Sequence, residues 1–280
     1  MLRQCTLGVD VGTSSSKGVL VSAGGDVLHS MVLAHEVDRP RPGWVEMDGR
    51  IWWQEFVAIA RSLTEMAAAD DLEITAVGVS GMGPCVLLTE DFSRARRLFM
   101  PASWLAHKLT DAYVLDHQSA SQVSPLYDVE LEEWHTPFWE RYARGIEAPR
   151  LLWAGEIAGT VTDAAAADTG IHAGTPVIAG TIDAWTEAVS VGAYRTGDLM
   201  LMYGTTMFLV ATGAETLRTP SMWTTVGAFP GTRNLAGGLS TSGALTAWLK
   251  DLTGADYAAL LGEAATSGQG AGGLVMLPYF

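Results

Sequence analysis

A short polar turn between two apolar runs near the N-terminus is the feature that most limits how this chain can fold. Residues 6–11 (TLGVDV) and 17–23 (KGVLVSA) each have the length and the branched apolar residues of a β-strand. Gly12, Thr13 and Ser14 lie in the turn between them. Two strands joined by so few residues must run antiparallel, so we expect the fold to begin with a β-hairpin.

The composition of this turn suits an anion. Backbone N–H groups and hydroxyl oxygens in a small concave turn form the arrangement that holds phosphate. Asp10, at the end of the first strand, places a carboxylate where a phosphate-bound magnesium ion needs an oxygen ligand or an anchor for its waters. The motif alone does not separate a phosphate site from an ordinary glycine turn.

The same plan recurs later in the chain. Residues 199–212 (LMLMYGTTMFLVAT) contain an apolar run, then Gly204, Thr205 and Thr206, then a second apolar run. Two such turns could face each other across the phosphates of one nucleotide. Each hairpin taken alone is typical of any large α/β protein, but the pair favours phosphate binding.

A third segment supplies a candidate for the chemistry. Residues 176–185 (PVIAGTIDAW) indicate a buried strand that breaks at Gly180 and places Asp183 at the start of a helix over residues 184–191. An acid in this position can accept a proton from a hydroxyl group while the hydroxyl attacks phosphorus. The alternative is that Asp183 is only the N-cap of the helix, a frequent use of aspartate.

In their order and spacing, these segments resemble the FGGY family of carbohydrate kinases, and most closely its xylulokinase-like members. The resemblance covers nearly the whole chain. It implies an α/β fold of the actin/hexokinase/Hsp70-like (ribonuclease H-like) ATPase type, in which helices flank a mixed β-sheet. The segments that carry it are residues 8–13 with Lys17, 43–46 with 52–53, 77–82, 174–177 with Asp183, 203–206, and 237–238 with Trp248.

The resemblance also implies roles for individual residues. Asp183 would be the catalytic base that takes the proton from the sugar hydroxyl, and Asp10 would organise Mg²⁺ through water. The residues expected to bind ATP are Gly12, Thr13, Ser14, Lys17, Gly204, Thr205 and Thr206. Those expected near the sugar, besides Asp183, are Trp44, Glu46, Met82 and Gly83. For Trp44 and Glu46, ordinary packing and a surface charge are equal alternatives.

Two departures from the family pattern leave the sugar open. Residues 81–84 are Gly-Met-Gly-Pro, where xylulokinases carry Gln-Met-His-Gly. The family also has a segment of several dozen residues, with an Asp-x-Arg stretch that reaches the sugar, in the place where this chain passes directly from Asp91 to Leu98. Both departures remove expected contacts with the substrate.

The implied domains are an N-terminal sugar- and phosphate-binding domain over residues 1–230 and the beginning of a C-terminal domain over residues 231–280. The apolar, strand-like run at 273–280 (GLVMLPYF) lies early in the family's second domain, before its glycine-rich adenosine loop. We therefore expect the second domain to be truncated. Its bared apolar surface would favour self-association into a homo-oligomer.

The predicted reaction is transfer of the γ-phosphate of ATP to a hydroxyl of a ketose or polyol, with D-xylulose or a related pentulose as the default. The alternative is an inactive, truncated relative that binds ligand or a partner without turnover. If the chain is an active kinase, we expect two lobes to close over the site and exclude water, which otherwise competes with the sugar as acceptor of the phosphoryl group.

Composition excludes several other classes of protein. A net charge of −14 argues against nucleic acid or an anionic membrane as partner. Cys5 and Cys85 lie in strand-like segments without metal spacing, and the six histidines form no ligand pair. Because the N-terminus lacks an apolar signal region and no run is long enough to span a bilayer, we expect a cytoplasmic protein.

The rest of the chain alternates between strand and helix patterns. Residues 26–34 and 74–79 indicate strands. A helix is expected over residues 48–69, with a buried stripe at Trp52, Phe56, Ile59, Leu63 and Met66. Helix and loop are expected over residues 102–159, with turn or cap positions at 110–111 and 116–117.

Overall fold

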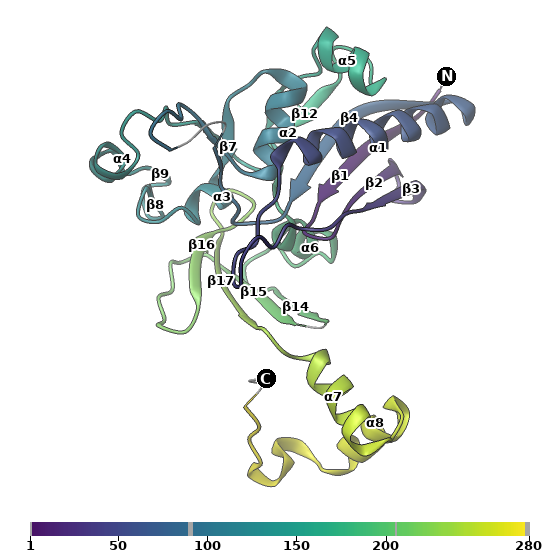
Figure 1. The fold of residues 1–280 in the computed structure, drawn as a ribbon, viewed down its shortest axis with the longest axis vertical. Coiled ribbons are helices and arrows are strands. Elements are labelled where there is room, and N and C mark those ends of the chain that lie inside the picture. Colours follow the sequence, from purple (N-terminus) through teal and green to yellow (C-terminus); the bar gives the residue numbers. More distant parts are fainter. Residues whose placement is uncertain (1, 89–91, 205, 278–280) are drawn as a thin grey trace.

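A computed structural model of the protein describes residues 2–88, 92–204 and 206–277. A mixed, seven-stranded sheet forms its larger half (Figure 1). The strand order is β11-β12-β4-β1-β2-β3, with β13 also paired to β4. These strands are β1 (Arg3–Val11), β2 (Ser15–Ser22), β3 (Val27–Ala34), β4 (Leu72–Gly81), β11 (Ile157–Thr160), β12 (Pro176–Ile178) and β13 (Thr181–Ile182).

The predicted N-terminal hairpin is confirmed. β1 pairs antiparallel with β2, and β2 with β3, whereas β4 runs parallel to β1 and to β12 and β13. The sheet is therefore mixed, as expected from a chain that opens with a hairpin and continues with alternating helices and strands.

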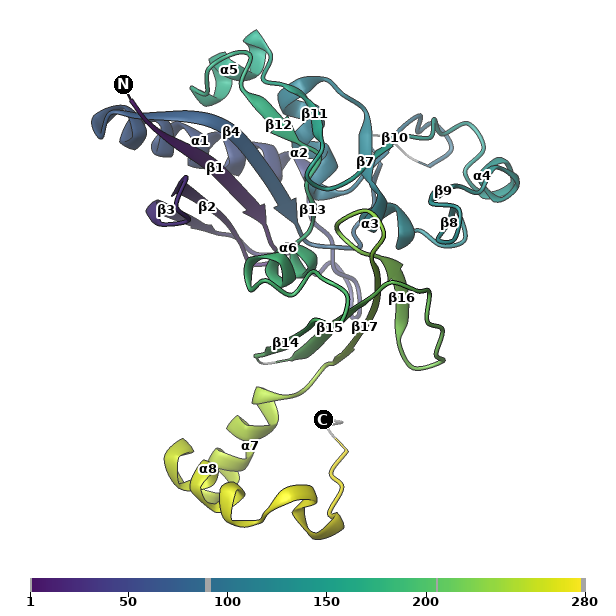
Figure 2. The ribbon, with the colours of Figure 1, turned by 180° about the vertical axis from the view of Figure 1, so that it is seen from behind.

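One face of this sheet is covered by α1 (Gly49–Ala69) and α2 (Pro101–Thr110), as Figures 1 and 2 show from opposite sides, and α5 (Asp163–Thr169) packs against both of these helices. The Asp48 side chain caps α1 by accepting a hydrogen bond from the Arg50 N–H. The predicted stripe is buried from Trp52 to Leu63 but ends before Met66, which is 36% exposed. The next residue, Ala67, is 2% exposed and packs in the core, so the buried face of α1 continues through Ala67 rather than through Met66.

A second, four-stranded antiparallel sheet has the order β14-β15-β17-β16. Its strands are β14 (Leu199–Tyr203), β15 (Met207–Gly213), β16 (Trp223–Val226) and β17 (Arg233–Leu239). Helix α6 (Asp183–Ser190) joins the two sheets, and its Trp185 packs in a second hydrophobic core with Val210 and Val226. The predicted second hairpin is confirmed. Because β17 pairs with β15, this sheet includes residues on both sides of position 230, and a domain boundary there stays a prediction.

To one side of the two sheets lies a region of short elements, most of them within residues 102–159, where the sequence suggested only helix and loop. They are β5 (Leu87–Leu88), β6 (Leu98–Phe99), β7 (Val114–Asp116), α3 (His117–Ser121), β8 (Tyr127–Asp128), β9 (Glu133–Trp134), α4 (Thr136–Tyr142) and β10 (Arg150–Leu152). That expectation was incomplete, because strands of two or three residues are too short to show a hydrophobic period. The expected cap positions are confirmed: Asp111 ends α2 in the left-handed conformation, and Asp116 caps α3.

The C-terminal helices α7 (Gly243–Thr253) and α8 (Tyr257–Thr266) and the 3₁₀ helix η1 (Gln269–Gly273) lie apart from both sheets (Figures 1 and 2). The strand expected at the C-terminal run is wrong for residues 274–277, which are exposed and form neither helix nor strand. A strand needs a neighbour with which to pair, and no described strand lies beside this run; residues 278–280 lie outside the described part.

Two expectations from composition can be compared with the described residues. Cys5 and Cys85 are both free thiols. None of the described helices combines the length and the apolar character needed to cross a membrane.

Candidate active site

Three neighbouring parallel strands end at the same edge of the large sheet, and this edge positions both candidate carboxylates. Asp10 of β1 pairs with Ser80 of β4, and Ser80 in turn pairs with Thr181 of β13. Asp183 follows β13 by one residue and begins α6 at this edge. The structure thus brings together Asp10 and Asp183, which are 173 positions apart in the sequence.

The break between β12 and β13 depends on Gly180. Its φ of +72° lies in the left-handed region, and a Cβ atom there would collide with the backbone carbonyl of Val79. Glycine is the only residue that meets both conditions without strain. The predicted break at Gly180 is therefore confirmed, and it lets the chain turn from β12 into the short strand that carries Asp183.

Asp183 is the first residue of α6, and Ile182 occupies the N-cap position. The alternative that Asp183 is the N-cap is therefore wrong by one residue. Its Oδ1 accepts a hydrogen bond from the Ala184 N–H at 2.7 Å. Burial raises the pKa of Asp183 to about 6, the Ala184 N–H opposes this rise, and the charges of Asp10 and Glu187 add to it. Such a carboxylate is ionised at neutral pH and is a stronger base than an ordinary aspartate.

Asp10 has the surroundings expected of an anchor for a hydrated cation. Its Oδ1 accepts a hydrogen bond from the Ser80 hydroxyl at 2.7 Å. Burial and the charge of Asp10 raise the pKa of Glu187, and Lys17 lowers it. Within the described ranges, no three acidic, histidine or cysteine side chains enclose a metal. A magnesium ion that keeps most of its waters fits this donor set, because it needs only one or two carboxylates and would relieve the repulsion among them.

The first Gly-Thr turn is braced from beneath by a polar network that the sequence did not reveal. Glu55 Oε2 accepts from the Ser16 hydroxyl at 2.6 Å and lies 2.9 Å from His35 Nδ1. The other ring nitrogen of His35 lies 3.1 Å from the carbonyl oxygen of Gly12. Since both partners of the ring are acceptors, the full network forms only when both nitrogens carry protons. The His35 ring is half-buried under the turn.

The turn also touches the segment expected to meet the sugar. The Thr13 hydroxyl lies 3.8 Å from the sulfur of Met82, and the Met82 N–H donates to the Val11 carbonyl at 2.8 Å. A Cβ at Gly83 would overlap the Ile182 side chain, so this segment packs directly against the strand before Asp183. Gly83 therefore lies against the residue that precedes the candidate base, and Met82 lies against the first turn.

Two cavities adjoin this edge. The first, of about 410 Å³, is lined by Asp10, Lys17 and Thr181 together with apolar residues of the sheet and α6. The second, of about 500 Å³, includes Gly83 and Thr206 among the predicted residues, and Ile182 and Ala184 on either side of Asp183. Its other walls include Gln122, Trp185, Phe208 and Trp223, none of which was predicted as a site residue.

The second cavity combines aromatic walls with a few polar groups. This mixture is typical of sites for small organic ligands, where apolar faces bury the ligand and sparse polar groups orient it. The C–H faces of a sugar can lie on the rings while its hydroxyls meet an amide or hydroxyl group. No local pattern in the sequence predicts this cavity, because its walls come from several separate segments between Gly83 and Ser240.

Other predicted residues are not brought to Asp183. Trp44 is 52% exposed beneath the Arg41 guanidinium, and Glu46 pairs through its backbone with Asp38. Within the described ranges, neither lines either cavity, so their part in substrate binding stays a prediction.

The two Gly-Thr turns belong to different sheets, and neither of the two cavities includes both. In the second turn, the Gly204 N–H donates to the Thr206 carbonyl at 2.9 Å, and the Gly204 carbonyl accepts from the Gly243 N–H at 2.8 Å. Thr205 lies outside the described residues.

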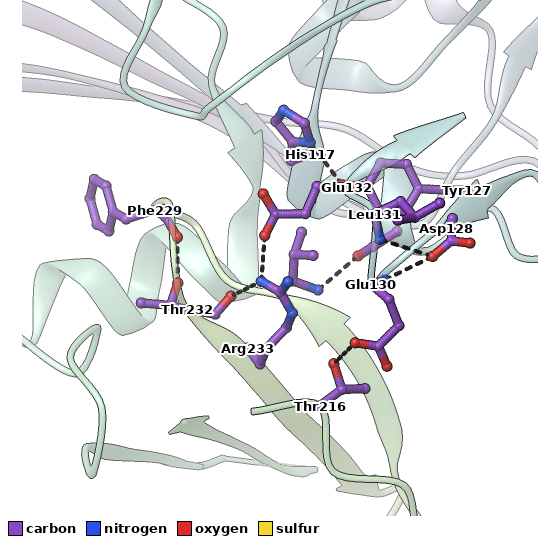
Figure 3. A network of polar contacts seen from close by, with 12 residues as sticks. His117, Tyr127, Asp128, Glu130, Leu131, Glu132, Thr216, Phe229, Thr232 and Arg233 are labelled. Carbon is purple, nitrogen blue, oxygen red and sulfur yellow. Dashed lines mark hydrogen bonds and ion pairs between the residues drawn. The ribbon is translucent and has the colours of Figure 1, made fainter. Parts of the chain in front are cut away.

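A polar network fixes the second sheet against the loop between β8 and β9 (Figure 3). Arg233 of β17 forms an ion pair of 2.6 Å with Glu132 of this loop. Glu130 accepts hydrogen bonds from the Thr216 hydroxyl at 3.0 Å and from Arg218 at 3.2 Å. Because the second sheet supplies one wall of the second cavity, these contacts also set where that wall lies.

Comparisons with known proteins agree with this architecture. The family model described as "FGGY family of carbohydrate kinases, N-terminal domain" matches residues 5–91 and 87–190. Xylulose kinase of Escherichia coli is 23% identical in an alignment 334 positions long, gaps included, which covers 98% of this chain and 68% of that protein. Glycerol kinase of Nocardia farcinica is 35% identical over 92 residues, or 32% of this chain and 18% of that protein.

Among solved structures, xylulose kinase from Rhodospirillum rubrum has a TM-score of 0.88 at 22% identity and covers 99% of this chain and 70% of that one. A likeness at this identity establishes the fold. The predicted actin/hexokinase-like α/β architecture is therefore confirmed. The family model matches in two parts that meet at residues 87–91. This junction is next to the place where the family's segment with the Asp-x-Arg stretch is missing from this chain.

Proposed function

Because this chain belongs to the FGGY family of carbohydrate kinases, we propose that it transfers the γ-phosphate of ATP to a hydroxyl of a ketose or polyol. The observation that carries this proposal is the convergence of Asp183 and Asp10 at the ends of three parallel strands. One carboxylate is half-buried and has a raised pKa, and the other is held by Ser80 beside Lys17.

In the proposed reaction, Asp183 accepts the proton of the attacking hydroxyl. Its pKa of about 6 keeps it ionised at neutral pH, close to the value that suits a general base at that pH. The Ala184 N–H and the start of α6 hold the carboxylate in one orientation. Positioning of this kind supplies much of the catalysis in phosphoryl transfer, since little covalent chemistry falls to the protein.

Asp10 is the proposed anchor for Mg²⁺. The ion, when bound, supplies positive charge to the phosphate oxygens of ATP. The turn at residues 12–14 would contribute N–H and hydroxyl groups to the same phosphates, and the brace formed by Glu55 and His35 would keep this turn in place.

For the acceptor, we propose a pentulose such as D-xylulose. Support comes from the xylulose kinases that match 98% of this chain. The cavity of about 500 Å³ beside Asp183 is large enough for a five-carbon sugar, and its aromatic walls suit the C–H faces of such a molecule. Glycerol kinases match shorter parts of the chain, so polyols belong in the same test.

The test is a coupled ADP-release assay on the purified chain with Mg·ATP and a panel of ketoses, aldonates and polyols. Asp183→Asn is the inactive variant, and we expect it to lose sugar-dependent release by at least about 10³-fold while it still binds ATP. Asp163→Asn is the matched control, because Asp163 is also the first residue of a helix but is exposed. Equal turnover by both variants would contradict the role of Asp183, and no release from the folded wild-type chain would contradict the kinase activity of this chain.

A further inference from the structure

A buried hydrogen-bond network lies directly behind the strand that carries Asp183. The Thr181 hydroxyl donates to Asp116 Oδ2 at 2.7 Å and lies 3.1 Å from Gln118 Oε1. Asp116 Oδ2 also accepts from the Ser119 N–H at 3.1 Å. Asp116, Gln118, Ser119 and Thr181 are each at most 2% exposed, so water does not compete for these bonds.

This network attaches β13 to a second part of the fold. β13 has only two residues and pairs with β4 at Ser80 and Gly81. Asp116 is the last residue of β7 and the N-cap of α3. Through Thr181, β13 is therefore held both by the ladder to β4 and by the side chain that starts α3. A two-residue strand makes few ladder bonds, so this second attachment carries a large share of its restraint.

Stability alone does not account for an aspartate at this position. Burial raises the pKa of Asp116 to about 6, against the hydrogen bonds from Ser119 and Thr181 that favour the charged form. In the described part of the chain no ion pair includes Asp116. A buried carboxylate without a cationic partner is expensive, and a well-packed apolar residue is commonly as stable or more stable.

From this geometry we infer that Asp116, acting through Thr181, is a positioning residue for the carboxylate of Asp183. The inference rests on the proposed role of Asp183 as the base. Thr181 lies two residues before Asp183, with only Ile182 between them. A shift of β13 therefore moves the base directly, and a displacement of about 1 Å at a reacting group can lower a rate by about 10²-fold.

The test compares Thr181→Val with Thr181→Ser. The valine variant keeps the branched shape and removes the hydroxyl, whereas the serine variant keeps the hydroxyl and loses a methyl group. We expect Thr181→Val to lower kcat by roughly 10- to 100-fold, with the KM for ATP within about twofold of wild type. We expect Thr181→Ser, which keeps the hydroxyl, to retain most of the wild-type kcat. If the valine variant does not fold, Thr181→Cys replaces it, because a thiol is a weak donor.

A second measurement does not depend on turnover. Carbon-13 NMR of the aspartate carboxyl groups follows the titration of Asp183, for which burial raises the pKa to about 6. Since burial is the main cause of that value, loosening β13 admits water and moves the midpoint down toward that of an ordinary aspartate. We expect the pKa of Asp183 to fall in Thr181→Val and to stay near the wild-type value in Thr181→Ser.

Thr225→Val is the matched control. Thr225 of β16 is 2% exposed, and among the described residues its hydroxyl has no hydrogen-bond partner. This substitution also replaces a buried hydroxyl by a methyl group but breaks no hydrogen bond. Both kcat and the pKa of Asp183 should therefore stay unchanged. An Asp183 midpoint that does not move in the folded Thr181→Val protein, or moves equally in Thr225→Val, overturns the inference. A wild-type chain without sugar-dependent ADP release contradicts the proposed function instead, and the titration still decides the positioning role.

Discussion

Replacement of Asp183 by asparagine should stabilise the folded protein at neutral pH while it removes the proposed base. Asparagine has nearly the same shape, and its Oδ1 can still accept from the Ala184 N–H. What it removes is a half-buried negative charge that the neighbouring charges of Asp10 and Glu187 further disfavour. Active sites often keep charged groups at a cost in stability, so removing the charge of Asp183 should raise the free energy of unfolding.

The size of the effect follows from the pKa. Folding raises the pKa of Asp183 from the ordinary 3.8 to about 6. Between these values the folded protein holds a proton that the unfolded chain has released, so stability falls as pH rises through this window. Each unit corresponds to about 1.36 kcal/mol, which gives at most about 3 kcal/mol of destabilisation above pH 6. Below pH 4 the carboxyl is protonated in both states and the penalty is absent.

Urea denaturation of wild type and Asp183→Asn at pH 4, 5, 6 and 8 measures this directly. The free energy of unfolding of the variant, relative to wild type, should be near zero at pH 4 and should rise to at most about 3 kcal/mol at pH 8. Asp163→Asn, at the exposed start of α5, should show no such dependence. A difference that is independent of pH, or that has the opposite sign, refutes the argument that burial strains this carboxylate.

Three further predictions concern other parts of the fold. Phe56→Ala should lower the free energy of unfolding by about 3–5 kcal/mol in urea denaturation, because Phe56 is fully buried between α1 and the large sheet. Glu55→Gln should weaken binding of Mg·ATP by roughly 3- to 10-fold in calorimetry, since His35 then loses a charged acceptor beneath the phosphate turn. Glu132→Ala should cost about 1–3 kcal/mol of stability, because it leaves its half-buried arginine partner without a counter-charge; unchanged values would refute each.

The parts of the fold that local patterns could predict are those with long periodic segments. Both hairpins follow from apolar runs on either side of a Gly-Thr turn, and α1 follows from the spacing of Trp52, Phe56, Ile59 and Leu63. The short strands β7 to β10 could not be predicted, because each pairs with a distant or equally short segment and has no period of its own. Their existence is decided by tertiary packing, which overrides local preference.

The same distinction applies to the candidate site. Asp10 and Asp183 were found because each lies where a predicted strand ends, and the ends of parallel strands meet at one edge. The bond from Thr181 to Asp116 joins residues 65 positions apart, and the contact of Ser16 with Glu55 spans 39. Buried polar partners of this kind leave no mark in a single sequence, since only the folded chain makes them neighbours.

The ion pair between Glu132 and Arg233 has a consequence for changing the substrate of this protein. The ion pair holds the sheet that contributes Phe208 and Trp223 to the second cavity, but neither Glu132 nor Arg233 lines that cavity. Arg233 lies at the opposite end of β17 from Gly238 and Leu239, which line the cavity, so a contact outside the cavity helps to hold its wall. Variants that accept bulkier or smaller substrates could therefore be sought in two ways. One is to replace side chains that line the cavity, and the other is to replace Glu132 or Arg233, which would move the second sheet without changing the lining side chains.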